Sequence, residues 1–176
     1  LAGSVHKASG GRFDPTIQPL WKCYGDASAQ GRLPDDQALE AAQALTGWDR
    51  VRFDTTGVTL PAGMSLTLNG IAQGYIADRI PVKLAAGGSV PLAARALATS
   101  APLGTTFDEN AQVGHIINPQ NGQPAHSRWQ EITISASTAA LADAVSTAAC
   151  LFESRSEMYH FVAQFEDIAI EQAAPV

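Results

Sequence analysis

The chain has 176 residues and a mass of 18.4 kDa, which is the size of one domain of ordinary length. Apolar residues make up 45% of it and charged residues 16%, and no apolar run approaches the roughly 20 residues of a membrane-spanning helix, so a transmembrane protein is excluded. The 17 acidic residues outnumber the 11 Lys and Arg residues for a formal net charge of -6, which argues against nucleic acid as the main partner.

The first third of the chain predicts a loop, a helix and a hairpin. Residues 8–22 contain a glycine pair and two prolines and are predicted to form an ordered loop that leads into a short element. Apolar residues recur with helical spacing over 34–46, after a proline and two aspartates and before a glycine, which predicts a surface helix. Residues 50–54 and 58–60 alternate around a short glycine-containing turn, the pattern of a β-hairpin.

A short strand and a glycine-rich helix are predicted next. Residues 66–68 form a strand that ends at Asn69, whose side chain is suited to cap a helix. In that helix Gly70, Gly74 and Asp78 repeat every four residues, so one face has almost no side chain near its start, although each glycine costs roughly 1 kcal/mol relative to alanine. Two interpretations stay open, namely tight packing against another backbone and a ligand at the helix N-terminus.

The middle of the chain predicts irregular structure with two short strands. Residues 81–104 are rich in Ala, Gly and Pro without a clear period and predict a poorly packed connection, within which 95–100 forms a strand. Residues 115–117 predict another strand, and the turn-rich run 118–124 follows it.

The C-terminal part contains the clearest helix of the chain. Ile132 and Ile134 alternate with polar residues in a predicted strand, and the alanine-rich stretch 138–152 predicts a helix capped by Ser137 or Thr138. The remaining tail mixes a helix over 158–164 with a strand over 168–170, and it carries no sign of chemistry.

Two cysteines, Cys23 and Cys150, lie far apart in the sequence. Their small number excludes a disulfide-rich scaffold and a cysteine-based metal site of the usual spacing, while a single disulfide between them stays open. The chain begins at Leu1 with neither a signal-peptide pattern nor a lipobox cysteine, and we interpret it as a processed or trimmed product.

Asp143 and Thr147 are candidates for a metal site. They are four residues apart on a predicted helix, which places a carboxylate and a hydroxyl on one face. Both are oxygen ligands of the kind that Mg²⁺ prefers, and this ion commonly takes only one or two protein ligands. The alternative is an ordinary polar pair on an exposed face, although a carboxylate among so many alanines calls for a cation or a donor.

His115 is the histidine best suited to catalysis. It precedes an apolar pair and a turn, a position from which an imidazole can reach a bound substrate as general base. A structural histidine is the alternative. The chain has no G-x-S-x-G elbow, no G-x-G-x-x-G motif and no Walker loop, so the standard hydrolase and nucleotide-binding motifs are excluded.

Four segments together resemble one family, the FAD:protein FMN transferases or ApbE-like proteins. In chain order they are SGGRFDPTIQPLW at 9–21, LTLNGIAQGYIADRI at 66–80, ATSAPLGTTFDENAQVGHIINPQNGQP at 98–124 and ITISASTAALADAVSTAACLF at 132–152. Each segment alone is a modest signal, whereas four in the family's order make chance agreement improbable. The second and third segments most resemble the NosX-type branch, which accompanies nitrous oxide respiration.

The resemblance implies an α+β fold with a flavin cleft between lobes, in which FAD lies beside Mg²⁺. The implied reaction breaks the FAD pyrophosphate, releases AMP and attaches FMN by a phosphoester to a threonine of an acceptor flavoprotein, which we expect to be membrane-associated. A location in the periplasm or cell envelope is implied as well. Relative to the family, the chain lacks the N-terminal portion and a segment near 81–90, so residues 1–176 are interpreted as a single truncated ApbE-like domain, either a fragment or a reduced homologue.

The resemblance also assigns site residues. Asp143, Thr147 and the backbone carbonyl of Gly70 match the family's metal ligands, and His115 matches the histidine that activates the acceptor threonine. The positions that match flavin contacts are Arg12, Phe13, Asp14, Thr67, Gln73 and Ile117. Three positions depart from the common pattern, since Thr67 replaces an aspartate, Gln73 replaces a lysine or glutamate, and Asn118 replaces an aspartate.

Three functions stay open on the sequence alone. The first, which we predict, is Mg²⁺-dependent transfer of FMN from FAD to the acceptor. The second is a Mg²⁺-dependent FAD pyrophosphatase, in which water replaces the acceptor threonine, and only the products separate it from the first. The third is a catalytically inactive flavin-binding or assembly protein, which the missing N-terminal portion favours.

Overall fold

The computed structural model describes residues 1–79, 95–125 and 128–176, and helices and strands alternate irregularly along the chain. The helices are α1 (Ala2–Ala8), α2 (Gln18–Ser28), α3 (Asp36–Gln43), α4 (Asn69–Arg79), α5 (Ala139–Ala149) and α6 (Arg155–Val162), with 3₁₀ turns at Pro15–Ile17 and Trp48–Arg50. The strands are β1 (Arg52–Phe53), β2 (Val58–Thr59), β3 (Ala96–Ser100), β4 (Trp129–Ala136) and β5 (Ala169–Pro175). The predicted α+β class is therefore confirmed.

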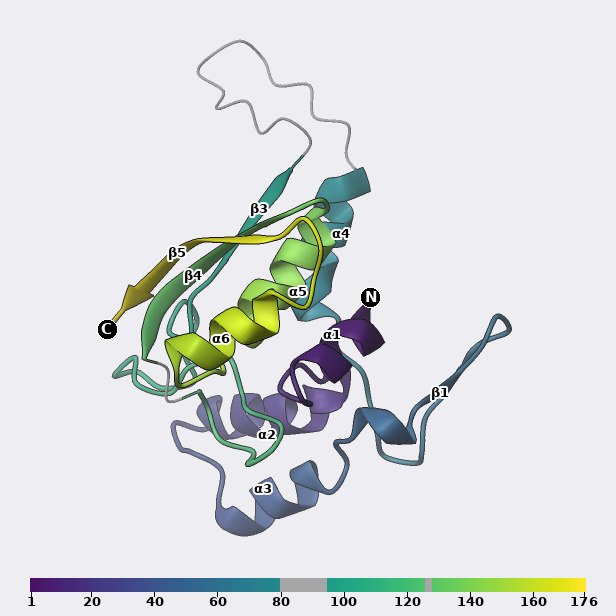
Figure 1. Ribbon diagram of the computed structural model, residues 1–176. Helices are drawn as coiled ribbons and strands as arrows, with labels where there is room; N and C mark the ends of the chain where they lie inside the picture. Colours follow the sequence, from purple (N-terminus) through teal and green to yellow (C-terminus); the bar gives the residue numbers. More distant parts are fainter. Residues whose placement is uncertain (80–94, 126–127) are drawn as a thin grey trace.

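A three-stranded antiparallel sheet, in the order β3-β4-β5, supports the body of the protein (Figure 1). In this sheet Ser100 pairs with Ile132, and Ile134 pairs with Ile170. Helix α5 packs against β3 and β4, and α4 packs against α5. The predicted alternation over β4 is confirmed, because Ile132 and Ile134 are both fully buried and share the face that packs on the helices.

Two hydrophobic clusters hold the chain together. The larger one lies between the sheet, α5 and α6, where the small side chains of α5 allow the helix backbone to approach the strands. The smaller one joins α2, α3 and the loop before β4, and it consists of Leu20, Tyr24, Ala42, Phe107 and Ile117. Residues of both clusters line the cavity described below.

Helices α4 and α5 touch through their backbones. A Cβ atom at Gly74 would lie 2.3 Å from the carbonyl oxygen of Ala139, a distance that no side chain tolerates. The Asp78 carboxylate accepts the N–H groups of Ala139 at 2.7 Å and Ala140 at 3.0 Å, and Thr138 Oγ1 accepts a further N–H of the first turn of α5. Tight packing thus explains two members of the four-residue repeat, and Thr138 is the cap.

We expect Asp78→Ala to lower the free energy of unfolding by about 1–2 kcal/mol, because two N–H groups of α5 lose their acceptor. Urea denaturation measures the change. Asp26→Ala is the matched control, since the exposed Asp26 side chain forms a surface ion pair with Lys22, and the substitution should cost less than about 0.5 kcal/mol. Equal losses in the two variants would contradict the capping role.

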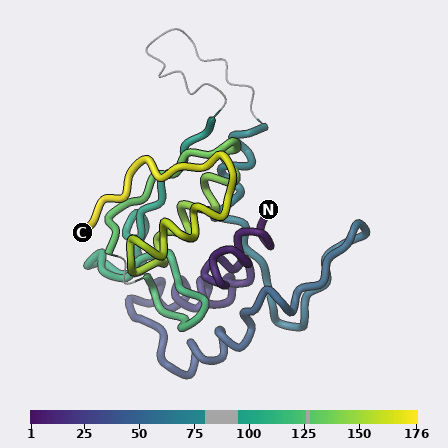
Figure 2. The backbone as a smooth tube through the Cα atoms, in the orientation of Figure 1, coloured from purple at the N-terminus to yellow at the C-terminus, as the bar shows by residue number. Residues whose placement is uncertain are grey.

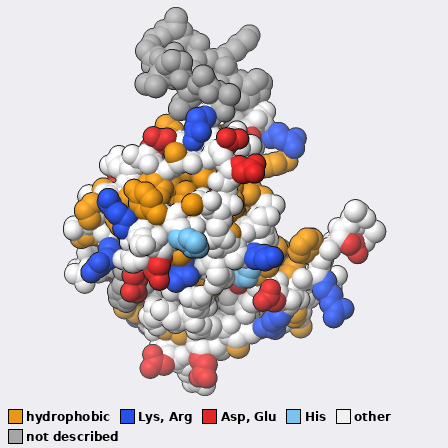
Figure 3. Space-filling model, viewed as in Figure 1, with side chains coloured by type: hydrophobic (Ala, Val, Ile, Leu, Met, Phe, Trp, Pro, Cys, Tyr) orange, Lys and Arg blue, Asp and Glu red, His pale blue; other side chains and the backbone are white. Residues whose placement is uncertain are grey.

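The hairpin is confirmed and extends away from the body of the protein (Figures 1 and 2). Strands β1 and β2 pair antiparallel with Phe53 opposite Val58. Both side chains are more than half exposed, at 62% and 59%, and orange hydrophobic side chains are visible on this arm in Figure 3.

The N-terminal part contains more helix than predicted. Residues 2–8 form α1, a helix that was not predicted, because only Val5 of it is buried and this segment lacks an apolar stripe. Residues 18–28 form α2 where a loop and a short element were predicted. Pro19 lies in the first turn of this helix, where proline is tolerated because its missing N–H has no helical partner.

Three other predictions need correction or refinement. The prediction of a strand over 66–68 is wrong, because this segment pairs with no strand and Thr67 donates its backbone N–H to the Pro15 carbonyl at 2.8 Å. The strand over 115–117 is wrong too, since the loop contributes only isolated bridges such as Ile117 with Pro124. The helices predicted over 34–46 and 158–164 are confirmed with the shifted bounds of α3 and α6.

The strand over 95–100 is confirmed as β3, whereas most of the predicted connection, and the segment near 81–90 in which the family is longer, lie outside the described residues. Cys23 and Cys150 are both free thiols, which closes the question of a disulfide between them. Burial raises the pKa of Cys150 to about 12, so this thiol stays protonated at neutral pH.

Candidate functional site

A cavity of about 690 Å³ lies between α4, α5, the end of β3 and two loops. This volume is within the range of small-molecule sites, about 300–1,000 Å³. The residues singled out from the sequence all line this cavity, and they are Arg12, Phe13, Asp14, Thr67, Gly70, Gln73, His115, Ile117, Asp143 and Thr147. The fold therefore brings to one place residues that are distant in the sequence.

Asp143 lies where α5 meets α4. Its Oδ2 atom accepts the Gly74 N–H at 3.2 Å. Burial raises the pKa of the Asp143 carboxyl, and this hydrogen bond lowers it in part. The Gly70 carbonyl is one turn earlier on α4, and its oxygen has two lone pairs, so it keeps capacity for another partner beside a helical N–H.

Gly70 lets the backbone of α4 approach Thr147. A Cβ atom at Gly70 would lie 3.3 Å from Thr147 Oγ1 and 3.2 Å from Phe13 Cε2, tighter than ordinary van der Waals contact. Thr147 lies one helical turn after Asp143 on α5, so both side chains face the cavity. In the four-residue repeat of α4, Gly70 thus borders the candidate site, whereas Gly74 and Asp78 serve the packing of α4 against α5.

The oxygen atoms at this end of the cavity fit a magnesium ion. The Asp143 carboxylate, the Thr147 hydroxyl and the Gly70 carbonyl are hard ligands, and Mg²⁺ completes its shell with water and phosphate oxygens. A cation would also stabilise the charged form of a carboxyl that burial disfavours. Within the described part of the chain, no three His, Cys, Asp or Glu residues gather as a metal cluster.

His115 is half-buried at the cavity wall and held by the neighbouring loop. Its Nδ1 atom lies 3.0 Å from the Thr105 carbonyl oxygen, which also accepts the backbone N–H of His115. Because a carbonyl oxygen only accepts, Nδ1 carries the proton of the neutral ring, and Nε2 offers a lone pair. An imidazole in this tautomer can take a proton.

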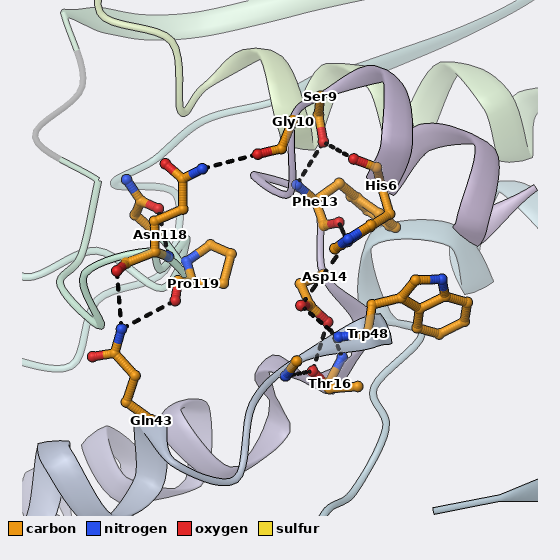
Figure 4. Close-up of polar contacts among 12 residues, drawn as sticks. His6, Ser9, Gly10, Phe13, Asp14, Thr16, Gln43, Trp48, Asn118 and Pro119 are labelled. Atoms are coloured by element: carbon orange, nitrogen blue, oxygen red, sulfur yellow. Dashed lines mark hydrogen bonds and ion pairs between the residues drawn. The ribbon is translucent and has the colours of Figure 1, made fainter. Parts of the chain in front are cut away.

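Asp14 lines the cavity, but protein groups surround its carboxylate (Figure 4). Oδ1 accepts the backbone N–H and the hydroxyl of Thr16, at 2.8 and 2.6 Å, and Oδ2 accepts the backbone N–H of Trp48 at 3.1 Å. The His6 ring bonds the Phe13 carbonyl at 2.8 Å. Asp14 therefore connects its own loop to the 3₁₀ turn at Trp48–Arg50. Together with the His6 contact, these hydrogen bonds fix the position of the neighbouring Phe13.

The remaining sequence-derived residues present different surfaces to the cavity. The Arg12 guanidinium lies over the Phe152 ring, 4.4 Å from its centroid, and bonds the Ser9 carbonyl. Gln73 is exposed, and its carboxamide bonds no other described residue, so it is free for a ligand. Ile117 is 4% exposed and supplies apolar wall, while Thr67 Oγ1 accepts the N–H of the first residue of α4.

Two residues with evident roles at the site were not predicted. Thr105 orients His115 through its carbonyl, and Ser100 contacts the Thr147 hydroxyl at 3.3 Å. A backbone carbonyl gives no signal in a sequence. For Ser100, the available signal was its place at the end of a predicted strand inside one of the four family-like segments, which by itself does not single it out.

Comparison with known proteins decides the family. Residues 1–90 and 81–170 match the sequence model of the ApbE family. The chain belongs to the ApbE family. No curated protein sequence matches it significantly. No helix of this ApbE chain, over the residues that the structure describes, has the length and apolar character to cross a membrane.

Solved ApbE structures share the fold. The ApbE protein of Thermotoga maritima is 26% identical with a TM-score of 0.76, over 96% of this chain and 70% of that chain. The flavinyl transferase ApbE of Pseudomonas stutzeri, in its apo form, is 21% identical with a TM-score of 0.73, over 98% and 69%. The flavin transferase ApbE of Vibrio cholerae is 19% identical with a TM-score of 0.72, over 98% and 72%. The expected ApbE-like fold is confirmed.

Proposed function

We propose that this chain is a Mg²⁺-dependent transferase that moves FMN from FAD to a threonine of an acceptor flavoprotein and releases AMP. The observation that carries the proposal is the meeting of Asp143, Thr147, Gly70 and His115 in one cavity of suitable size. Membership of the ApbE family, and two solved relatives that are named flavinyl or flavin transferases, support it.

In this proposal, different residues of the cavity have different roles in phosphoryl transfer. Asp143, Thr147 and the Gly70 carbonyl would hold Mg²⁺, which would neutralise negative charge on the pyrophosphate. Nε2 of His115 takes the proton of the acceptor threonine hydroxyl as its oxygen bonds to the FMN phosphorus. The bond from that phosphorus to the bridging oxygen breaks, and AMP leaves.

The rest of the cavity suits an isoalloxazine ring. Phe13 and Ile117 offer apolar surface for a flat aromatic ligand, and the free carboxamide of Gln73 can donate and accept hydrogen bonds at its edge. In this proposal Arg12, Thr67 and the Asp14 loop shape the flavin side of the cavity. The membrane-associated acceptor, the periplasmic or cell-envelope location and the NosX-type branch rest on the sequence resemblance and stay predictions.

Intact-protein mass spectrometry tests the proposal. The chain is incubated with FAD, Mg²⁺ and an acceptor flavoprotein domain, and a parallel sample contains EDTA. A gain of one FMN on the acceptor, lost with EDTA, is the expected result. Free FMN and AMP without a labelled acceptor would contradict the transferase and indicate a pyrophosphatase. FAD that stays intact would contradict both activities and indicate a protein that only binds flavin.

We expect His115→Gln to slow transfer by about 10²-fold, within the usual contribution of a general base. The substitution keeps a polar side chain but removes the basic Nε2. His160→Gln is the matched control, because His160 is exposed on α6 and does not line the cavity. The initial rate of acceptor labelling is measured for both, and a full rate in His115→Gln would contradict the role of the imidazole.

A further inference from the structure

We propose that Ser100 is a positioning residue that fixes the direction of the Thr147 hydroxyl, so that the oxygen lone pairs of Thr147 face the cavity. This inference rests on the proposed function, because the direction of that hydroxyl matters when Thr147 binds a metal ion. It concerns a residue at the end of β3 that neither the sequence nor the family resemblance singled out.

Three hydroxyl groups and one carbonyl form a short chain of contacts. Ser146 Oγ lies 3.0 Å from the Asp143 carbonyl oxygen, Ser100 Oγ lies 2.8 Å from Ser146 Oγ, and Thr147 Oγ1 lies 3.3 Å from Ser100 Oγ. Ser146 is fully buried, so water does not compete for its contacts with Asp143 and Ser100.

The direction of each hydrogen bond follows from the carbonyl at one end. A carbonyl oxygen only accepts, so the Ser146 hydroxyl donates its single proton to the Asp143 carbonyl. The Ser146 oxygen then accepts the proton of Ser100. With its own proton used, the Ser100 oxygen accepts from Thr147.

The consequence for Thr147 is a fixed orientation. Its proton is turned toward β3, and its free lone pairs are left on the side of the Gly70 backbone and the cavity. A hydroxyl ligand needs this arrangement, because the metal ion takes a lone pair and the proton must point elsewhere.

The position of Ser100 is itself well fixed. Its carbonyl oxygen lies 3.5 Å from Cys150 Sγ on α5, and it pairs with Ile132 of β4. Ser100 therefore approaches α5 at two points one helical turn apart, and its hydroxyl is held beside the pair Ser146 and Thr147.

The test measures the affinity of the purified chain for Mn²⁺ in the absence of nucleotide, with electron paramagnetic resonance as the readout. We expect Ser100→Ala to bind Mn²⁺ about tenfold more weakly than the unsubstituted chain, the usual effect of losing an outer-sphere partner, and Ser100→Thr to restore binding. Thr133→Ala is the matched control, because it removes a hydroxyl contact of 2.8 Å with Thr99 between β3 and β4, while Thr133 itself does not line the cavity.

A double variant separates positioning from a general structural effect. If Ser100 acts through the Thr147 hydroxyl, Ser100→Ala combined with Thr147→Val binds Mn²⁺ as Thr147→Val alone does. Additive losses would overturn the proposal. Equal affinities of the unsubstituted chain and Ser100→Ala, with weak binding by Asp143→Asn, would overturn the role of Ser100 alone. No Mn²⁺ binding by the unsubstituted chain would overturn it together with the metal site, and the FMN transfer assay judges the proposed function separately.

Discussion

Asp143→Asn should reduce the rate of FMN transfer by roughly 10³-fold, because charge stabilisation by a bound metal ion is worth several kcal/mol in the transition state. Asp143 is the only acidic side chain among the described residues that line the cavity apart from Asp14, whose carboxylate is taken up by Thr16 and Trp48. An asparagine amide is a neutral and much weaker ligand for Mg²⁺. Acceptor labelling at saturating FAD measures the loss.

The asparagine variant isolates charge from structure. Its amide oxygen can still accept the Gly74 N–H that Asp143 Oδ2 accepts at 3.2 Å, so the contact between α4 and α5 is preserved. Asp78→Asn is the matched control, since Asp78 lies on the same helix pair, caps α5 and does not line the cavity. A rate for Asp143→Asn close to that of Asp78→Asn would remove Asp143 from the metal site.

Gly74→Ala should produce the largest loss of stability among single methyl additions to α4, about 3 kcal/mol, at the upper end of the cost of overpacking. The new Cβ atom would lie 2.3 Å from the Ala139 carbonyl oxygen and 2.7 Å from the Ala140 nitrogen. Both are backbone atoms of the first turn of α5, which cannot rotate away as a side chain would. The helices must separate, and chemical denaturation followed by circular dichroism reports the change.

Gly57→Ala is the matched control for Gly74→Ala. Gly57 lies in the turn between β1 and β2, and a Cβ atom there meets nothing within 4 Å, so its stability should stay within about 0.5 kcal/mol. Because α4 carries Gly70 and α5 carries Asp143 and Thr147, the Gly74 variant should also lose transfer activity. A Gly74→Ala protein as stable as Gly57→Ala would show that the two helices can move apart freely.

Local patterns in the sequence predicted the elements that carry a clear period or clear end signals. The helix α5 and its Thr138 cap, the buried alternation of β4 and the hairpin around 54–58 were all found from spacing and end signals. Helices α1 and α2 were not found, because α1 buries a single residue and α2 begins after a proline-containing loop. The segment 66–68 has strand-like residues, yet its partner is a loop carbonyl.

The sequence by itself determined the family, through four ordered segments, and with it a set of candidate site residues. Only the tertiary structure brought those residues to one cavity, surrounded the Asp14 carboxylate with Thr16 and Trp48, and held His115 through Nδ1. It also gave the glycine repeat two roles, helix packing at Gly74 and proximity to Thr147 at Gly70. The physical reason is that hydrogen-bond partners and steric contacts decide these properties, and the partners here, such as Ser100 and Thr147, lie 47 residues apart.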